Sequence, residues 1–247
     1  MICGMRFESF SLSFKLFQIT TFLNFILILT GVPAVAAESG SVKGSVQFFG
    51  PLPDARSYEI KVNPEICGNR VAYQFVSVSS ENHGVRDAFV TIRSKDGSSL
   101  DGDRETVSLD NLKCRIEPQV IGMGKDQTLL IRNSDPVFHS LQFFSQDHLL
   151  FNTALPAGAE PLKRKVEQAG EIQVRCSVHP FMQGTLYVSD TPNFHLTDRF
   201  GGFQFSNLKP GAYILKALHR GLKPVEKEFE INSGENLNLT ILMERAD

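Results

Sequence analysis

Short stretches in which apolar and polar residues alternate recur along the chain after residue 38. Eight of them are rich in β-branched and aromatic residues, and they lie at 42–49, 86–92, 127–133, 172–176, 184–190, 201–205, 212–219 and 238–243. Gly, Pro, Asn and Asp separate the stretches, and none keeps a helical period for long. The pattern predicts an all-β protein of sandwich type.

The first 37 residues follow a different pattern. A positively charged start precedes an apolar run at 22–35, and the small residues "AVAA" at 34–37 end it. This order is typical of a secretory signal peptide. The alternative is an uncleaved membrane anchor, but the run is short for a transmembrane helix, and Gly31 and Pro33 interrupt it. We therefore expect a periplasmic or otherwise exported protein that has no membrane span after cleavage.

Charge excludes one class of partner. The chain has 25 basic and 27 acidic residues, and removal of 1–37 takes away Arg6, Lys15 and Glu8, which leaves a net charge of −3. A charge so close to zero gives no basic footprint for a nucleic acid. About 210 residues then remain, enough for one large β domain or two small ones.

The mature chain keeps three cysteines, Cys67, Cys114 and Cys176. In an oxidising compartment two of the three can pair, which leaves one thiol to be explained. Cys67 and Cys114 have no histidine or methionine close by in sequence and are the natural disulfide pair. Three cysteines allow three different single bridges, so the sequence alone leaves the pairing open.

The remaining cysteine belongs to a compact motif, "CSVHPFM" at 176–182. Cys176, His179 and Met182 follow the spacing C-x2-H-x2-M, which can supply a thiolate, an imidazole and a thioether from one loop. A mononuclear type 1 copper site needs a second imidazole. His139 follows a strand and an Asn-Ser-Asp-Pro turn upstream, and it supplies that ligand. We expect Asn133 to form a hydrogen bond across the ligand loops, and Ser177 also to support the ligands.

Other chemistries fit the motif less well. A structural zinc site usually takes four Cys or His ligands, and the sequence offers no second C-x2-C or H-x3-H pair. A catalytic cysteine usually lies at a helix N-terminus beside a base that a third group holds, whereas Cys176 ends a strand. His83, His148, His195 and His219 are scattered, and we interpret them as surface or structural residues.

The motif resembles the ligand loop of amicyanin- and plastocyanin-like cupredoxins, in "IQVRCSVHPFMQGTLYVSD" (172–190). The likeness extends upstream through 107–140, where Asn133 and His139 are six residues apart. It implies a Greek-key β-sandwich over 104–190, with His139, Cys176 and His179 as equatorial copper ligands and Met182 as the axial one. One departure is Ser140, where many cupredoxins have Asn, and this puts a hydrogen bond between the ligand loops in doubt.

The rest of the chain resembles a second family. "HLTDRFGGFQFSNLKPGAYILKALHRG" (195–221) is similar to the later strands of carboxypeptidase-regulatory-like (transthyretin-like) domains, and 42–54 and 85–92 resemble their opening strands. This likeness implies a smaller β-sandwich built from 38–103 together with 191–247, with the copper domain inserted between them. The alternative is a copper domain over 38–190 followed by a C-terminal module.

The resemblance implies a function without catalysis. Cupredoxins carry one electron at a time, and their downstream copper-binding histidine usually reaches the surface within an apolar patch. We therefore expect Phe138, Pro180 and Phe181 to form a docking face for a redox partner such as a c-type cytochrome or a dehydrogenase. A copper carrier, and a scaffold module with a vestigial metal site, remain the alternatives.

Overall fold

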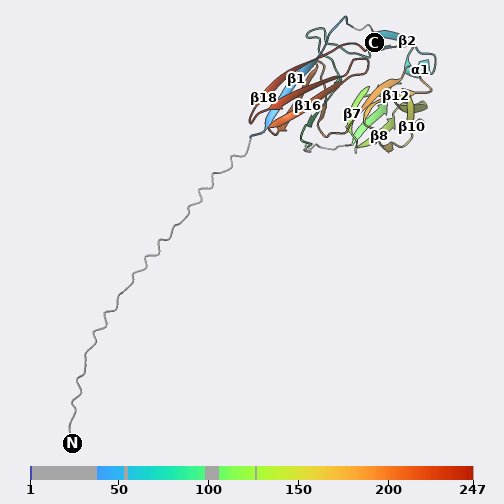
Figure 1. The fold of residues 1–247 in the computed structure, drawn as a ribbon. Helices are drawn as coiled ribbons and strands as arrows, with labels where there is room; N and C mark the ends of the chain where they lie inside the picture. Colours follow the sequence, from blue (N-terminus) through green and yellow to red (C-terminus); the bar gives the residue numbers. More distant parts are fainter. Residues whose placement is uncertain (2–37, 53–54, 98–105, 126, 247) are drawn as a thin grey trace. The chain divides into compact units, whose positions relative to one another are not determined.

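Two cores of buried side chains organise the computed structural model. The structure describes residues 1, 38–52, 55–97, 106–125 and 127–246 (Figure 1). The eight predicted strands are all present, and the all-β fold is confirmed. Within the described ranges the single helix is α1, Pro64–Cys67. The predicted signal peptide lies outside the described residues, except for Met1.

The first sandwich contains the predicted ligands and has two sheets. The larger sheet has the strand order β10-β9-β12-β13-β7, and these are His148–Leu155, His139–Ser145, Gly170–Cys176, Gln183–Ser189 and Val120–Gly124. The smaller sheet has the order β11-β8-β5-β6, formed by Leu162–Lys165, Thr128–Asn133, Val107–Asn111 and Ile116–Glu117. Side chains alternate between the faces of a strand, so each sheet contributes one row of apolar residues to the core between them.

The second sandwich also has two sheets. One has the order β15-β1-β18, formed by Gly202–Leu208, Gly40–Phe48 and Asn236–Met243. The other has the order β14-β4-β16-β17, formed by Phe194–Leu196, Phe89–Ser94, Gly211–Leu218 and Val225–Ile231. Its core includes Val46, Ile92, Phe203, Leu215 and Ile241.

Strand β1 joins distant parts of the sequence. It pairs antiparallel with β15 and parallel with β18, so that Val42 lies between Phe205 and Leu237. In the other sheet, β4 pairs with β14 and β16. Strands from before residue 95 and from after residue 193 therefore pair within the same two sheets.

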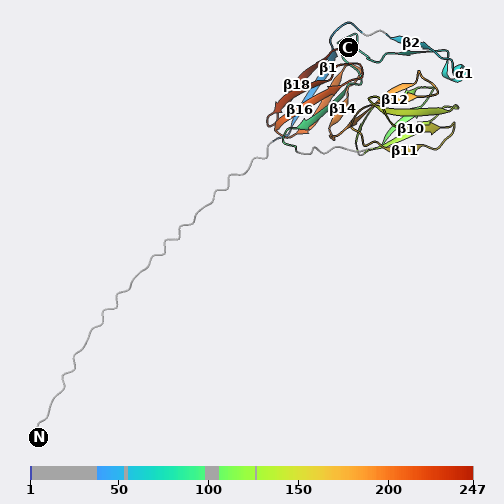
Figure 2. The same cartoon turned by 45° about the vertical axis from the view of Figure 1, so that its right-hand side comes forward.

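One early segment differs from this arrangement. Residues 56–73, here called the covering hairpin, comprise β2 (Arg56–Glu59), α1 and β3 (Arg70–Tyr73) (Figure 2). The sequence places this segment in the flanking module, but its buried side chains Ile60, Val71 and Tyr73 belong to the core of the first sandwich. The apolar side chains of such a short two-stranded ribbon need another sheet to pack against.

In the part of the chain that the structure describes, no helix is long and apolar enough to cross a bilayer.

A buried histidine lies in the second half of the chain. His219 is 6% exposed, and its Nδ1 lies 2.8 Å from the carbonyl oxygen of Arg220. Burial lowers the pKa of His219 to about 4, against the opposing effect of backbone hydrogen bonds with Arg220 and Arg86. The interpretation of this residue as structural fits its position.

We expect His219 to make the metal-free protein sensitive to acid. The unfolded chain gains a proton here near pH 6.5 and the folded chain only near pH 4, so stability is lost as the pH falls through this window. The full loss is about 3 kcal/mol. Urea unfolding at pH 7.5 and 4.5 should show His219→Gln losing about 2 kcal/mol less than the native chain. The exposed His148→Gln is the control, and equal losses in all three chains would refute the prediction.

Candidate metal centre

Strand pairing brings His139 and Cys176 together. His139 begins β9 and Cys176 ends β12, and the two strands are antiparallel neighbours with Cys176 opposite Leu141. The start of one strand therefore lies beside the end of the other. Both side chains occupy positions on the buried face of their strands. The alternating apolar residues of the two strands thus aim one imidazole and one thiol into the same end of the core.

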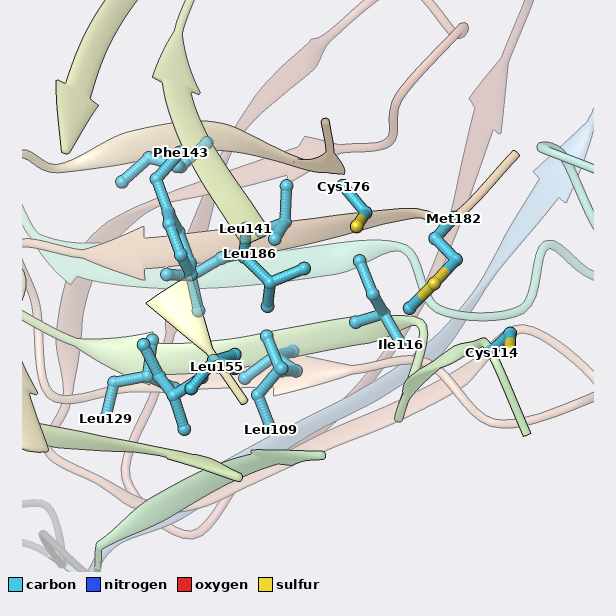
Figure 3. Packing of buried hydrophobic residues seen from close by; sticks show 14 of the residues in the cluster. Leu109, Cys114, Ile116, Leu129, Leu141, Phe143, Leu155, Cys176, Met182 and Leu186 are labelled. Atoms are coloured by element: carbon cyan, nitrogen blue, oxygen red, sulfur yellow. The ribbon is translucent and has the colours of Figure 1, made fainter. Parts of the chain in front are cut away.

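The loop from Ser177 to Met182 returns the chain to the same point. The Met182 N–H donates to the His179 carbonyl (2.8 Å), and the Cys176 N–H donates to the Met182 carbonyl (3.1 Å). This tight turn places His179 and Met182 inside, and neither is measurably exposed to solvent. Figure 3 shows Cys176 and Met182 at one end of the core cluster, with Cys114 beyond them and Leu129 at the opposite end.

Three of the four predicted ligands converge closely. Cys176 Sγ lies 3.8 Å from Nδ1 of His139 and 3.8 Å from Nδ1 of His179. One ligand atom from each of the three residues lies within 4.8 Å of the other two. A buried thiol with two imidazoles suits copper, which prefers soft sulfur and imidazole donors. The donor set therefore fits a copper ion, with Met182 buried in the same cluster.

The pKa shifts at two of the three residues favour metal binding, whereas the shift at His139 opposes it. Burial lowers the pKa of His139, but interactions with Cys176 and Asp135 outweigh this and raise it above its ordinary value. Burial raises the pKa of the Cys176 thiol, but hydrogen bonds from His139 and from backbone groups of the loop outweigh it, so the pKa lies below its ordinary value. Burial and the charge on His139 lower the pKa of His179. Because a metal binds thiolate and neutral imidazole, the shifts at Cys176 and His179 reduce the protons that it must displace.

Asp135 is the residue that the sequence interpretation missed. Its Oδ2 lies 2.9 Å from His139 Nε2, and its two oxygens accept hydrogen bonds from the N–H groups of Lys113 (2.6 Å) and Cys114 (2.8 Å). The carboxylate is 5% exposed. It leaves His139 Nδ1 directed toward Cys176, because a ligating histidine is oriented through its other ring nitrogen. Its place in the Asn-Ser-Asp-Pro turn, four residues before His139, was the available signal.

Asn133 forms hydrogen bonds inside the loop that precedes His139. Its Nδ2 lies within hydrogen-bonding distance of the carbonyl oxygens of Val137 (2.9 Å), Leu155 (2.8 Å) and Pro156 (3.1 Å). Its Oδ1 accepts from the Asp135 N–H. Asn133 thus shapes the loop that carries His139 and ties it to the end of β10, rather than linking it to the Cys176 loop.

The link between the ligand loops comes from Ser177. Its backbone N–H donates to the carbonyl oxygen of Ser140 at 2.9 Å, and its hydroxyl lies 3.4 Å from the same oxygen. The serine at 140 therefore does not remove the loop-to-loop hydrogen bond, because the backbone of that residue accepts it.

The expected docking face is wrong for His179 and Phe181. His179 is 0% exposed and Phe181 is 8% exposed, whereas Phe138 is 45% exposed and Pro180 is also at the surface. The covering hairpin lies against His179, and Asn63 Oδ1 is 3.1 Å from His179 Nε2. Because the hairpin comes from far upstream in the sequence, no spacing around the motif could reveal it.

The disulfide between Cys67 and Cys114 is confirmed, and Cys176 is the free thiol among the described cysteines. The bridge fastens the end of α1 to the first sandwich. Each of its sulfur atoms lies within 4.8 Å of a ring nitrogen of His179. The disulfide is therefore part of the surroundings of the candidate metal centre as well as a cross-link.

No family model matches the chain, and no curated protein sequence matches it. Among solved structures, the chain is similar to a purple cupredoxin from Nitrosopumilus maritimus at 23% identity, over 34% of this chain and 99% of that chain, with a TM-score of 0.30. It is also similar to a reduced amicyanin mutant at 17% identity, over 40% of this chain and 99% of that chain, with a TM-score of 0.31.

A third similar structure is the Cu-containing nitrite reductase from Thermus scotoductus. The identity is 19%, over 40% of this chain and 25% of that chain, with a TM-score of 0.32. Matches this weak cover a minor part of the chain and do not assign it to a family. The chemistry of the centre therefore rests on its own residues.

Proposed function

We propose that the protein is an exported mononuclear copper protein that carries one electron at a time. The observation that carries this proposal is the buried set of Cys176 Sγ and the Nδ1 atoms of His139 and His179, with both S–N distances at 3.8 Å. A copper ion held there would supply one-electron chemistry by alternating between Cu(I) and Cu(II). Met182, which is buried in the same cluster, would add a weak thioether ligand.

The surrounding residues support a carrier in preference to an enzyme. Asp135 and Asn133 fix the His139 loop, and Ser177 joins it to the Cys176 loop. Ligands that are held this firmly change position little between oxidation states, which favours rapid electron transfer. The four proposed ligands are at most 2% exposed, so a substrate would have no direct access to them.

The proposal includes a location and a partner. The predicted signal peptide and the disulfide both suit the periplasm or another oxidising compartment. The partner would be a redox protein such as a c-type cytochrome or a dehydrogenase, and not a nucleic acid. The second sandwich would be an accessory module of the carboxypeptidase-regulatory-like type.

A redox titration tests the electron carrier. The copper-loaded mature protein should show an intense visible thiolate-to-copper band that disappears on addition of one electron per chain and returns fully on reoxidation. The same cycle after chelation of the copper is the control. A band that does not return, or a Cu(II) protein that cannot be reduced without losing its metal, would exclude the electron carrier.

The covering hairpin favours a second candidate, a periplasmic copper carrier. Its Asn63 lies against His179, which is 0% exposed, and this lengthens the path from a bound metal to any partner on that side. A carrier would hold Cu(I) and release it to an acceptor. Rapid transfer of Cu(I) to a competing chelator, together with slow electron exchange, would select this function over electron transport.

A further inference from the structure

The geometry points to a second metal site that exists only when the disulfide is reduced. We propose that the thiolates of Cys67 and Cys114, together with His179, then bind a soft monovalent cation such as Cu(I). The three residues come from α1, from the turn between β5 and β6, and from the Cys176 loop. Ligand atoms of all three already lie within 4.8 Å of one another in the oxidised protein.

The donors match the cation in type and spacing. Two thiolates and an imidazole are ligands for Cu(I), whose preference is for soft sulfur. The Cα atoms of Cys67 and Cys114 are 5.2 Å apart, so the two side chains point toward a common space. Once the bond between the sulfurs is broken, small rotations about Cα–Cβ can separate them to flank a metal ion. The fold of the first sandwich does not have to change.

The two cysteines are held very differently. Cys114 is 0% exposed, and its N–H donates to the Asp135 carboxylate at 2.8 Å. Cys67 is partly exposed and ends a four-residue helix that has no buried residue. Its N–H donates to the Asn63 carbonyl at 2.8 Å, within the same turn. Cys114 therefore provides a fixed ligand, and Cys67 provides one that a reductant can reach and that can adjust.

The opening step is a thiol–disulfide exchange with a dithiol reductant. One reductant thiolate attacks a sulfur of the bridge and displaces the other as a thiolate, and the second reductant thiol then resolves the mixed disulfide. The bridge gains two electrons and two protons, and the reductant becomes a disulfide. Binding of the cation afterwards displaces the thiol protons to solvent.

His179 connects this site to the one built on Cys176. Its Nδ1 lies 3.8 Å from Cys176 Sγ, and its Nε2 faces the covering hairpin through Asn63 at 3.1 Å. A cation that enters between Cys67 and Cys114 would therefore be one imidazole ring away from Cys176. The reduced hairpin would serve as the entry point for Cu(I). This role as an entry point rests on the proposed function, whereas the second site itself does not.

Anaerobic Cu(I) binding by the full mature chain with Cys176→Ser tests the second site, because this change removes the first centre. The disulfide is reduced with a phosphine that is then removed, and Cu(I) binding is measured by competition with a chromogenic chelator. We expect one Cu(I) per reduced chain and none in the oxidised chain. Cys67→Ser with Cys114→Ser in the same background should not bind, and His179→Ala should weaken binding by about tenfold or more.

The native chain provides a second measurement that does not depend on these variants. Reduction should raise its Cu(I) stoichiometry by one, and X-ray absorption on the reduced Cys176→Ser chain should show sulfur and nitrogen ligands in a ratio of two to one. Equal stoichiometry before and after reduction would overturn the proposal. A native chain could also bind no copper with its disulfide intact but one Cu(I) after the disulfide is reduced. This result would refute the copper site at Cys176 and leave the second site standing.

Discussion

Replacement of Cys176 by serine is expected to abolish the intense visible absorption of the copper-loaded protein. The band requires a thiolate bound to copper, and Cys176 is the free cysteine among those that the structure describes. Serine has nearly the same size, so the buried position should tolerate it. The loss should be complete, and any remaining Cu(II) should show only weak absorption. The measurement is the visible spectrum of each protein at one equivalent of copper.

Ser177→Ala is a matched control for this experiment. Ser177 is the next residue along the loop, and its side chain is exposed. The link to Ser140 is made mainly by the backbone N–H, at 2.9 Å, and alanine retains it. The alanine variant should therefore keep the band. An undiminished band in Cys176→Ser would show that the thiolate is not a ligand, and the site assignment would be wrong.

Replacement of Asp135 by alanine is expected to cost about 3 kcal/mol of the free energy of unfolding of the metal-free protein. Its carboxylate accepts from the N–H groups of Lys113 and Cys114 and contacts His139 Nε2. Alanine leaves the buried N–H group of Cys114 without its acceptor and removes the partner of a buried imidazole. Urea unfolding of the metal-free protein with an intact disulfide measures the change.

Two further variants serve as controls for Asp135→Ala. Asp135→Asn keeps one oxygen acceptor and should lose less than Asp135→Ala. Asp110→Ala removes a carboxylate whose bonds to Ser134 are exposed, and it should cost about 1 kcal/mol or less. If Asp135→Ala lowers the free energy of unfolding no more than Asp110→Ala, the Asp135 carboxylate does not hold the turn at Lys113 and Cys114 against the His139 loop. Its proposed role beside His139 would then be wrong.

Much of the candidate metal centre could be predicted because the residues that define it are close together in sequence. The spacing of Cys176, His179 and Met182 within one loop is visible in the sequence, as is the turn that precedes His139. The alternating pattern of 172–176 predicts a strand that ends at Cys176, and the structure has that strand as β12. Cys67 and Cys114 were the natural disulfide pair, because neither has a histidine or methionine close by in sequence. The sequence alone left the pairing open, and the structure confirms it.

The surroundings of the centre were not predictable in the same way. The contact between Asn63 and His179 joins residues 116 positions apart, and no local pattern specifies such a pairing. The covering hairpin has short strands whose alternation is too brief to assign to a particular core. The largest difference from expectation is at His179, which lies against this hairpin and is buried. An exposed histidine within an apolar docking face was implied by the family resemblance alone. Likewise, the strand His148–Leu155 lies at the edge of its sheet, with few buried positions to give it a pattern.

We propose that Cys176, His139 and His179 bind one copper ion. The most direct test is titration of the metal-free mature chain with Cu(II), with the disulfide intact, followed by its visible absorption. We predict an intense thiolate-to-copper band that grows linearly and stops at one equivalent. A titration that produces no such band at any ratio of copper to protein would contradict the claim.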